Sequence, residues 1–479
     1  MLMAFRQKLG LISGLARKDR SAKFNNLLHL VNEWSLKWGF TMLNRTESVG
    51  IDRISLKAYE EDVERNVEDL LNRMKKMSYR PQAARRAYIP KGNGKQRPLG
   101  ILTVEDRMVQ KVMSRILEAI YEEDFKDFSY GFRPGRNQHQ AIAKLNGILT
   151  QRPVNYVIDA DIKGFFDNVN HEALKRCLEK RISDRKFIRY VMRFLKSGVM
   201  EEGKYLKTHF GTPQGGVISP VLANVYLHYA LDVWFDEKVR SELRGTAEMV
   251  RFADDFVICV QYKSDAELLL TMLKERMERC HLELSEEKTR LVRFGRCAFE
   301  DWKRNRRNSK RKDWQKPGTF NFLGFTHYCT CTPKGRYKIG RKTEKKRFSG
   351  SLLRAKVWLK KIRNQYKLKV IWEKISRKLV GHYRYYGVSG NYRALGMYYF
   401  RIVRLLFKWL NRRSQKKSYN WEEFNKYLKA HSLPRPKIFC DLCKLVQSQG
   451  ATMKSRMREI LTSGSVRGKV SHYAWNTHT

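Results

Sequence analysis

Apolar residues in the first 80 positions recur at the three- and four-residue spacing of a helix face. One such face combines Val63, Val67, Leu70 and Leu71. The segment SVGIDRIS at 48–55 is expected to be a loop between helices. We therefore expect a helical extension over residues 1–80.

From Tyr88 the pattern changes to that of paired strands. AYIP, then KGNGK, then QRPLGIL predict a strand, a turn and a second strand, and the Asn-Gly pair at 93–94 is a strong hairpin signal. Helical patterns then alternate with short strands up to about residue 328. This alternation predicts a mixed α/β region.

Two of the predicted strands run directly into carboxylates. VNYVI is followed by Asp159 and Asp161, and MVRFA is followed by Asp254 and Asp255. In the second case another apolar run, FVICV, follows at once. The second pair is therefore expected at the tip of a hairpin.

Beyond about residue 335 we expect a helical and strongly basic region. Ile371, Ile375 and Leu379 share a helix face there. The last segment, 440–479, is basic and poor in large apolar residues, so we expect part of it to lack fixed structure.

Charge is the most unusual feature of the composition. The chain has 97 Lys and Arg against 48 Asp and Glu, a formal net charge of +49. An excess spread over the whole chain repels itself unless a polyanion shares the space. Nucleic acid is the expected partner, bound with an affinity that falls steeply with salt. The run KRNRRNSKRK at 303–312 predicts an insertion that contacts phosphate, with a disordered basic loop as the alternative.

Cysteine usage and hydropathy limit the cellular environments in which the protein is expected to work. The eight cysteines follow no regular framework, which favours a reducing, intracellular environment. Cys440 and Cys443 have the spacing of a zinc site, but no second pair lies nearby, so two ordinary thiols are favoured over zinc. No stretch approaches the ~20 apolar residues that span a membrane, and the N-terminus lacks the apolar core of a secretion signal.

An acidic hairpin tip needs a physical explanation, because adjacent like charges repel and Asp is disfavoured in strands. Exposure to water would make the charges tolerable, but a divalent cation would relieve the repulsion better. Carboxylates from two strands can hold two Mg²⁺ ions about 4 Å apart, the arrangement used for nucleotidyl transfer. These considerations leave open whether Asp159, Asp161 or Asp167 joins Asp254 and Asp255.

Several sequence blocks together resemble the reverse transcriptases of group II introns. These blocks are DADIKGFFDNVNH at 159–171, TPQGGVISP at 212–220, FADD at 252–255 and FNFLGF at 320–325. Each alone is a short pattern, but their order and distances are specific. The resemblance extends upstream to SVGIDRISLKAYE and downstream to LVGHYRYYGVSGN and LPRPKI, and covers about residues 40–440.

The resemblance implies the residues of the reaction centre. Asp161, which precedes Ile-Lys-Gly, and Asp254 are the implied metal ligands, with the backbone carbonyl of Ile162 as a further ligand. Asp255 is the adjacent catalytic carboxylate, with a less direct role. The implied cofactor is Mg²⁺, as two ions.

A second implied set binds the incoming deoxynucleotide. Lys91 and Arg97 would clamp the triphosphate, although a solvated hairpin also explains two basic residues beside a turn. Phe166 would lie under the sugar and exclude a 2′-hydroxyl, unless it is a core residue. Gln214 would position nucleotide and template. Lys288 would protonate the leaving pyrophosphate, with an exposed helix-end lysine as the alternative.

A third implied set contacts template and primer. Its members are Arg133, Arg136, Gly215, Gly216, Leu323 and Gly324. The two arginines belong to the block SYGFRPGRNQHQAI, the first two glycines would let backbone approach the duplex closely, and the last two residues would grip the primer end.

The implied fold is an α/β (α+β) right-hand polymerase, with fingers and palm around an antiparallel sheet, followed by an α-helical thumb and maturase region, domain X. We expect the domains to be the extension at 1–80, fingers and palm at 81–335, domain X at 336–440 and a basic tail at 441–479, a candidate DNA-binding region.

The implied function is RNA-directed DNA polymerisation with maturase activity: binding group II intron RNA to aid splicing and copying it into DNA during retrohoming. The expected partners are intron RNA, target DNA and primer, and dNTPs. The expected location of the protein is the cytoplasm of a bacterium, in association with the nucleoid. The oligomeric state is open, with a dimer as one option. A host-domesticated enzyme of repair or defence, and a splicing cofactor without polymerase activity, are the alternatives.

The chain departs from the family pattern in two respects. The His-Asn-His set of a C-terminal endonuclease is not found, so bottom-strand cleavage is expected to be absent and mobility to use an existing DNA 3′ end. FADD also replaces the commoner YADD, which loses a hydroxyl but keeps the ring, so little loss of activity is expected.

Overall fold

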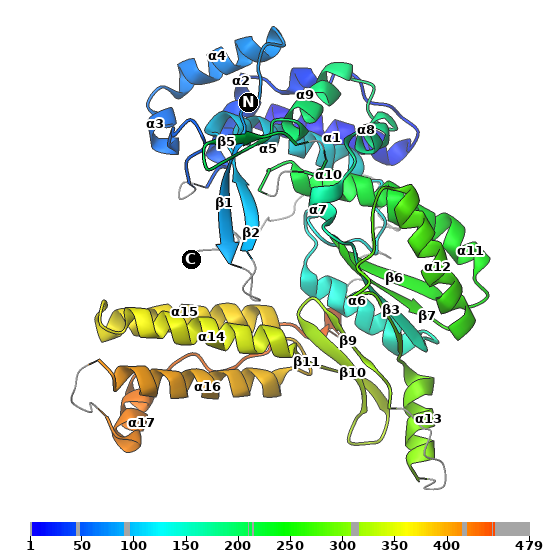
Figure 1. Ribbon diagram of the computed structural model, residues 1–479, viewed down its shortest axis with the longest axis vertical. Helices are drawn as coiled ribbons and strands as arrows, with labels where there is room; N and C mark the ends of the chain where they lie inside the picture. Colours follow the sequence, from blue (N-terminus) through cyan, green and yellow to red (C-terminus); the bar gives the residue numbers. More distant parts are fainter. Residues whose placement is uncertain are drawn as a thin grey trace.

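The computed structural model describes residues 2–44, 48–90, 96–208, 210–212, 215–307, 316–413, 419–442 and 444–445. Figure 1 shows an upper lobe that holds the N-terminal helices, a sheet with flanking helices on the right, and a separate layer of long helices below. Within the described ranges, no helix combines the length and the apolar character needed to cross a membrane.

The first 80 residues are largely helical, as predicted. They form α1 (Leu2–Lys18), the short 3-10 turn η1 (Leu28–Leu30), α2 (Glu33–Thr41), α3 (Leu56–Glu60) and α4 (Val63–Lys75). Helices α1 and α2 pack on α5 (Val104–Tyr121), so closely that a Cβ on Gly39 would lie 3.0 Å from the Met108 carbonyl oxygen. Their buried residues join the same core as those of the following region, so the core continues across residue 80.

The hairpin predicted from Tyr88 onward is present, begins at Ala84 and is the centre of a small sheet in the upper lobe. Its strands are β1 (Ala84–Pro90), β2 (Gln96–Ile101), β4 (Val199–Glu201) and β5 (Lys204–Leu206). Their order is β2-β1-β4-β5, and Pro90 pairs with Gln96 next to the turn. The hairpin points toward the lower helices in Figure 1. The turn itself lies outside the described residues.

The second sheet is the predicted palm, and its strands are antiparallel. They are β3 (Tyr156–Asp161), β6 (Ala247–Phe252), β7 (Asp255–Val260) and β8 (Arg290–Arg293), in the order β6-β7-β3-β8. Side chains alternate between the two faces of a strand. Accordingly, Ile158 and Ile258 face the large core with α12 (Lys263–Arg279), whereas Val157 and Val257 face a second core with α6 (Gln138–Gln151).

The remaining helices of this region connect the two sheets. They are α7 (Phe165–Asn168), α8 (His171–Glu179), α9 (Arg185–Leu195), α10 (Ser219–Leu227), the π-helical turns η2 (His228–Asp232) and η3 (Phe235–Val239), and α11 (Arg240–Glu242). Helix α10 contacts both α5 and α8, and thereby ties the palm to the upper lobe.

A third sheet corrects the expectation that the chain becomes helical at about residue 335. Strands β9 (Thr319–Phe322), β10 (Phe325–Cys331) and β11 (Tyr337–Thr343) form an antiparallel sheet, so the predicted boundary falls between two paired strands. Helix α13 (Arg296–Arg307) precedes it and carries the start of the basic run at 303–312; the rest of that run lies outside the described residues.

The lower layer of helices has its own core and matches the predicted thumb. It consists of α14 (Lys345–Ile362), α15 (Leu368–Tyr386), α16 (Tyr392–Leu410) and α17 (Trp421–Ala430). The predicted face of Ile371, Ile375 and Leu379 is buried in it. Cys440 is buried where its backbone pairs with Val388, whereas its CxxC partner lies outside the described residues.

Candidate active site

The acidic hairpin tip is built by β6 and β7. Phe252 pairs with Asp255 at the last register position, which leaves Ala253 and Asp254 to make the turn. Ala253 has a φ of 57°, a left-handed conformation that non-glycine residues rarely adopt. The sequence pattern had predicted this hairpin and its acidic tip.

The neighbouring strand β3 brings the third carboxylate to the same end of the sheet. Asp161 is the direct register partner of Asp255. Its carbonyl oxygen accepts a hydrogen bond from the Ser285 amide at 2.8 Å, which fixes the end of β3. Of the other candidates, Asp167 is exposed on α7, and Asp159 is buried and paired with Arg290 at 2.8 Å. The structure therefore brings together Asp161, Asp254 and Asp255.

Burial and mutual repulsion make this cluster electrostatically strained. Burial raises the pKa of Asp255 to about 8, and the charges of Asp159, Asp161 and Asp254 act in the same direction. Burial also raises the pKa of Asp254, with Asp161 adding to the effect. Lys288 offsets part of the negative charge through an ion pair of 2.5 Å between its Nζ and Asp161 Oδ2. A cation is the natural complement of such a site.

The donor set fits Mg²⁺ rather than a metal held in an all-protein cage. Among the described residues, no three His, Cys, Asp or Glu side chains converge closely enough to enclose a metal ion. Mg²⁺ typically uses only one or two carboxylates, keeps several waters and is completed by substrate phosphates. The backbone carbonyl of Ile162, whose side chain is buried directly after Asp161, stays a predicted ligand.

Behind the turn lies a buried ionic network that the sequence patterns had not singled out. Arg251 and Asp232 are both 0% exposed, and the Arg251 Nε donates to Asp232 Oδ1 at 2.7 Å. The Arg251 Nη1 donates to Asn224 Oδ1 at 3.1 Å and to the Ala253 carbonyl oxygen at 3.0 Å. One guanidinium therefore connects α10 and η2 to the residue before Asp254.

The loop before α6 packs against the same turn. Asn224 Nδ2 donates to the Gly131 carbonyl oxygen at 2.8 Å, and the Tyr130 amide donates to the Arg251 carbonyl oxygen at 2.9 Å. A Cβ on Gly131 would lie 2.3 Å from the Ala253 nitrogen, so only glycine fits there. Arg251, between the apolar Val250 and Phe252, was the one sequence signal for this network.

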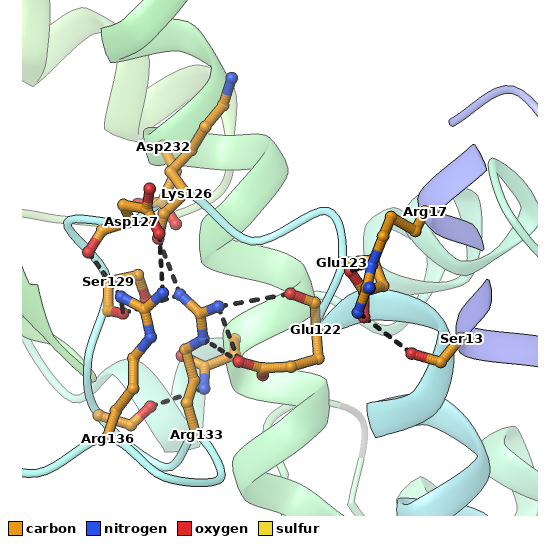
Figure 2. Close-up of polar contacts among 12 residues, drawn as sticks. Ser13, Arg17, Glu122, Glu123, Lys126, Asp127, Ser129, Arg133, Arg136 and Asp232 are labelled. Atoms are coloured by element: carbon orange, nitrogen blue, oxygen red, sulfur yellow. Dashed lines mark hydrogen bonds and ion pairs between the residues drawn. The ribbon is translucent and has the colours of Figure 1, made fainter. Parts of the chain in front are cut away.

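This packing corrects the prediction that Arg133 contacts template. Its side chain is 2% exposed and binds Glu122 Oε1 at 2.7 Å. It also donates to the carbonyl oxygens of Lys126 and Ser129, both at 2.8 Å (Figure 2). All of these partners belong to the protein, so Arg133 orders the loop and is not available to a nucleic acid.

Arg136 lies beside it and is also largely engaged. It donates to the carbonyl oxygen of Asp127 at 2.6 Å and to Asp127 Oδ1 at 2.8 Å (Figure 2). Its guanidinium also lies over the Tyr130 ring at 5.3 Å from the centroid, within the about 6 Å of a cation–π contact. Its side chain keeps 18% exposure, and its contact with template stays a prediction.

The predicted sugar contact, Phe166, lies on α7, the short helix that follows β3 and Asp161 in the chain. Phe165 is buried at 2% exposure, and Phe166 is only partly buried, so the second ring of the pair is the accessible one. Phe132, which the sequence patterns had not indicated, is 51% exposed and meets Phe166 edge to face at 6.2 Å. The two rings form an apolar surface between α7 and the loop before α6.

The fingers hairpin also contributes a positive charge to this site. Arg97 on β2 is exposed, and its charge lowers the pKa of Asp254, against the effect of burial. Gly215 has a φ of 109°, and a Cβ there would lie 2.6 Å from the Gly100 carbonyl oxygen. Its need for glycine is therefore explained by β2, while contact of Gly215 and the buried Gly216 with a duplex stays a prediction. Lys91 and Gln214 lie outside the described residues.

The predicted primer-end residues form the turn between β9 and β10. Leu323 and Gly324 have φ values of 49° and 77°, as expected for a tight two-residue hairpin. A backbone hydrogen bond from Leu323 lowers the pKa of Asp255, against the larger effect of burial. The Tyr385 hydroxyl donates to the Leu323 carbonyl oxygen at 3.2 Å. This turn therefore links the acidic site to α15.

Comparisons with known proteins agree with this geometry. Residues 89–327 match the family model described as reverse transcriptase (RNA-dependent DNA polymerase). The chain is 34% identical to Protein YkfC of Escherichia coli over 278 residues, 51% of this chain and 73% of that protein. It is 34% identical to the group II intron-encoded protein LtrA of Lactococcus lactis over 246 residues, 49% of this chain and 41% of that protein. A protein in the cob intron of Schizosaccharomyces pombe is 38% identical over 177 residues, 37% of this chain and 21% of that protein.

Proposed function

Because this chain belongs to the reverse transcriptases, the RNA-dependent DNA polymerases, we propose that it is the reverse transcriptase and maturase of a group II intron. It would bind the intron RNA, aid its splicing and copy it into DNA during retrohoming, in the nucleoid-associated cytoplasm of a bacterium. The observation that carries the chemical part is the register pairing of Asp161 with Asp255 beside Asp254, in a cluster where burial and the neighbouring carboxylates raise the pKa of Asp255.

The reaction joins a primer 3′-oxygen to the α-phosphorus of a dNTP and breaks the bond to pyrophosphate. Asp161, Asp254 and the Ile162 carbonyl would hold two Mg²⁺ ions, which when bound acidify the attacking hydroxyl and neutralise the departing phosphates. Arg97, together with Lys91, would bind the triphosphate. Lys288 sits 2.5 Å from Asp161 and would donate a proton to the pyrophosphate as it leaves.

Sugar selection is assigned to Phe166. We expect Phe166→Ala to lower the preference for dNTP over rNTP by about tenfold or more, because the ring would no longer exclude a 2′-hydroxyl. The measurement is the ratio of kcat/KM for a dNTP and the matching rNTP in single-nucleotide extension. Phe166→Tyr keeps the ring and is expected to keep the selectivity. An unchanged ratio in the alanine variant would reject the assignment.

The maturase role is tested on RNA. The DNA that flanks the reading frame is transcribed, and splicing of the transcript is followed at low Mg²⁺ with and without protein. We expect the protein to speed splicing by about tenfold or more, since it would stabilise the folded intron by binding it. Flanking DNA that encodes no spliceable RNA would contradict the maturase role and favour a host enzyme of repair or defence.

A further inference from the structure

A positively charged cavity lies in the upper lobe, on residues that the reaction centre does not use. It has a volume of about 440 Å³ and is open to solvent. Its lining includes Arg80, from the segment after α4, and Arg189, Arg193 and Lys196, from α9 and the residue that follows it. The last three are spaced by four and three residues, which places them on one helix face.

These cations repel one another instead of pairing with carboxylates. Burial lowers the pKa of Arg193, and the charges of Arg80 and Arg189 lower it further. Among the described residues that line the cavity, none is Asp or Glu. Arg80, Arg189 and Lys196 are exposed, so their charges are accessible to an anion from solvent.

Part of the cavity is rigidly held. Arg193 Nη1 donates to the carbonyl oxygens of Met77 at 3.0 Å and Tyr79 at 2.9 Å. Arg193 is thereby fixed to the segment that follows α4. The cavity wall thus exists before any ligand arrives, and a ligand need not order it.

An aromatic ring stands at the edge of the cavity. Tyr205 on β5 is 54% exposed. A Cβ on Gly198 would lie 2.4 Å from its ring, so the ring rests directly on glycine backbone with much of its surface open. Exposed aromatic rings beside basic grooves are the usual platforms for stacking single-stranded bases.

We propose that this cavity binds the phosphodiester backbone of single-stranded nucleic acid, with one base stacked on Tyr205. Arg80, Arg189 and Lys196 would contact phosphate, and Arg193 would maintain the positive potential. The proposal rests on nucleic acid being the substrate of this protein, and it adds a binding site on the upper lobe that does not depend on maturase activity.

The test compares two triple variants of the full chain. The cavity variant is Arg80→Gln, Arg189→Gln and Lys196→Gln, which leaves Arg193 in place because it holds backbone. The control variant, Lys238→Gln, Lys274→Gln and Arg279→Gln, removes the same charge from exposed positions on the palm helices. Binding of a fluorescent 20-nucleotide oligouridine is measured over a range of salt concentrations.

Each phosphate contact on a single strand contributes about 0.7 to the slope of log affinity against log salt. We therefore expect the cavity variant to lose about 1 to 2 from the slope and to bind about tenfold more weakly, with little change in slope for the control. Tyr205→Ala is expected to weaken binding about tenfold, and Tyr205→Phe to restore it. Equal effects in both triple variants, or none in either, would overturn the proposal.

Competition by inorganic phosphate tests whether the cavity binds the phosphates of a nucleic acid or free phosphate. Sodium phosphate, at matched ionic strength, is expected to compete with the oligonucleotide on wild type more than on the cavity variant. Phosphate that binds in the cavity without displacing the RNA would indicate a site for a free anion and contradict the proposal. DNA synthesis by the wild type is assayed separately. If the wild type makes no DNA but still differs from the cavity variant in the slope of log affinity against log salt, the polymerase site is refuted and the cavity is not.

Discussion

Replacement of Asp254 by alanine is expected to abolish DNA synthesis and to leave RNA binding intact. Asp254 stands at the tip of the β6–β7 hairpin, next to Asp161 and Asp255, and has no role in the core of the sheet. Loss of a metal ligand removes a charge interaction worth several kcal/mol in the transition state. We expect the rate to fall at least a thousandfold, on the order of 4 kcal/mol.

RNA binding supplies the control for this variant. The chain carries a formal charge of +49, and removal of one carboxylate only makes it more positive. Affinity for RNA should therefore not fall. The two measurements are primer extension under single-turnover conditions and a salt titration of RNA binding. A folded Asp254→Ala protein that loses both activities together would contradict the separation of the two roles.

Replacement of Asp232 by alanine is expected to destabilise the protein by about 3–5 kcal/mol, the usual cost of leaving one member of a buried ion pair without its partner. The side chains of Asp232 and Arg251 are both 0% exposed, so the arginine left by the substitution would be a buried charge without its carboxylate. Arg251 also holds the Ala253 carbonyl oxygen at 3.0 Å, so its displacement should disturb the catalytic turn. Chemical denaturation measures the loss of stability.

A matched surface pair and a double variant sharpen this prediction. Arg17 is 66% exposed and pairs with Glu123 at 2.9 Å (Figure 2), so Arg17→Ala should cost less than about 1 kcal/mol. Asp232→Leu combined with Arg251→Met should recover part of the stability, because no charge is left buried. It should still be slow in DNA synthesis, since Ala253 has lost its donor. Equal stabilities of Asp232→Ala and Arg17→Ala would contradict this account.

Local patterns were sufficient to predict the elements that carry the chemistry. Apolar runs that end in aspartate predicted β3 and the β6–β7 hairpin, because strand periodicity and an acidic turn both depend only on residues that are adjacent in the sequence. The choice of Asp161 over Asp159 did not come from the pattern. In the structure the two differ by their partners: Asp159 is buried against Arg290, and Asp161 pairs with Lys288.

Features that depend on distant partners were missed or wrong. Arg133 was assigned to the template because the resemblance of its sequence block implied it, and only the fold shows Glu122 and two carbonyl oxygens around it. Strand β11 was missed because its sequence, YKIGRKT, is rich in basic residues, and its pairing with β10 depends on the tertiary fold. Gly131 carries no local signal for its approach to Ala253.

The most direct test of the acidic site is primer extension on an RNA template with dNTPs and Mg²⁺, by the wild type and by Asp161→Ala side by side. We predict extension by the wild type and none by the variant, with equal RNA binding by both. Extension by Asp161→Ala at the wild-type rate would contradict the site. A well-folded wild type that binds RNA and extends nothing would instead leave a splicing cofactor without polymerase activity.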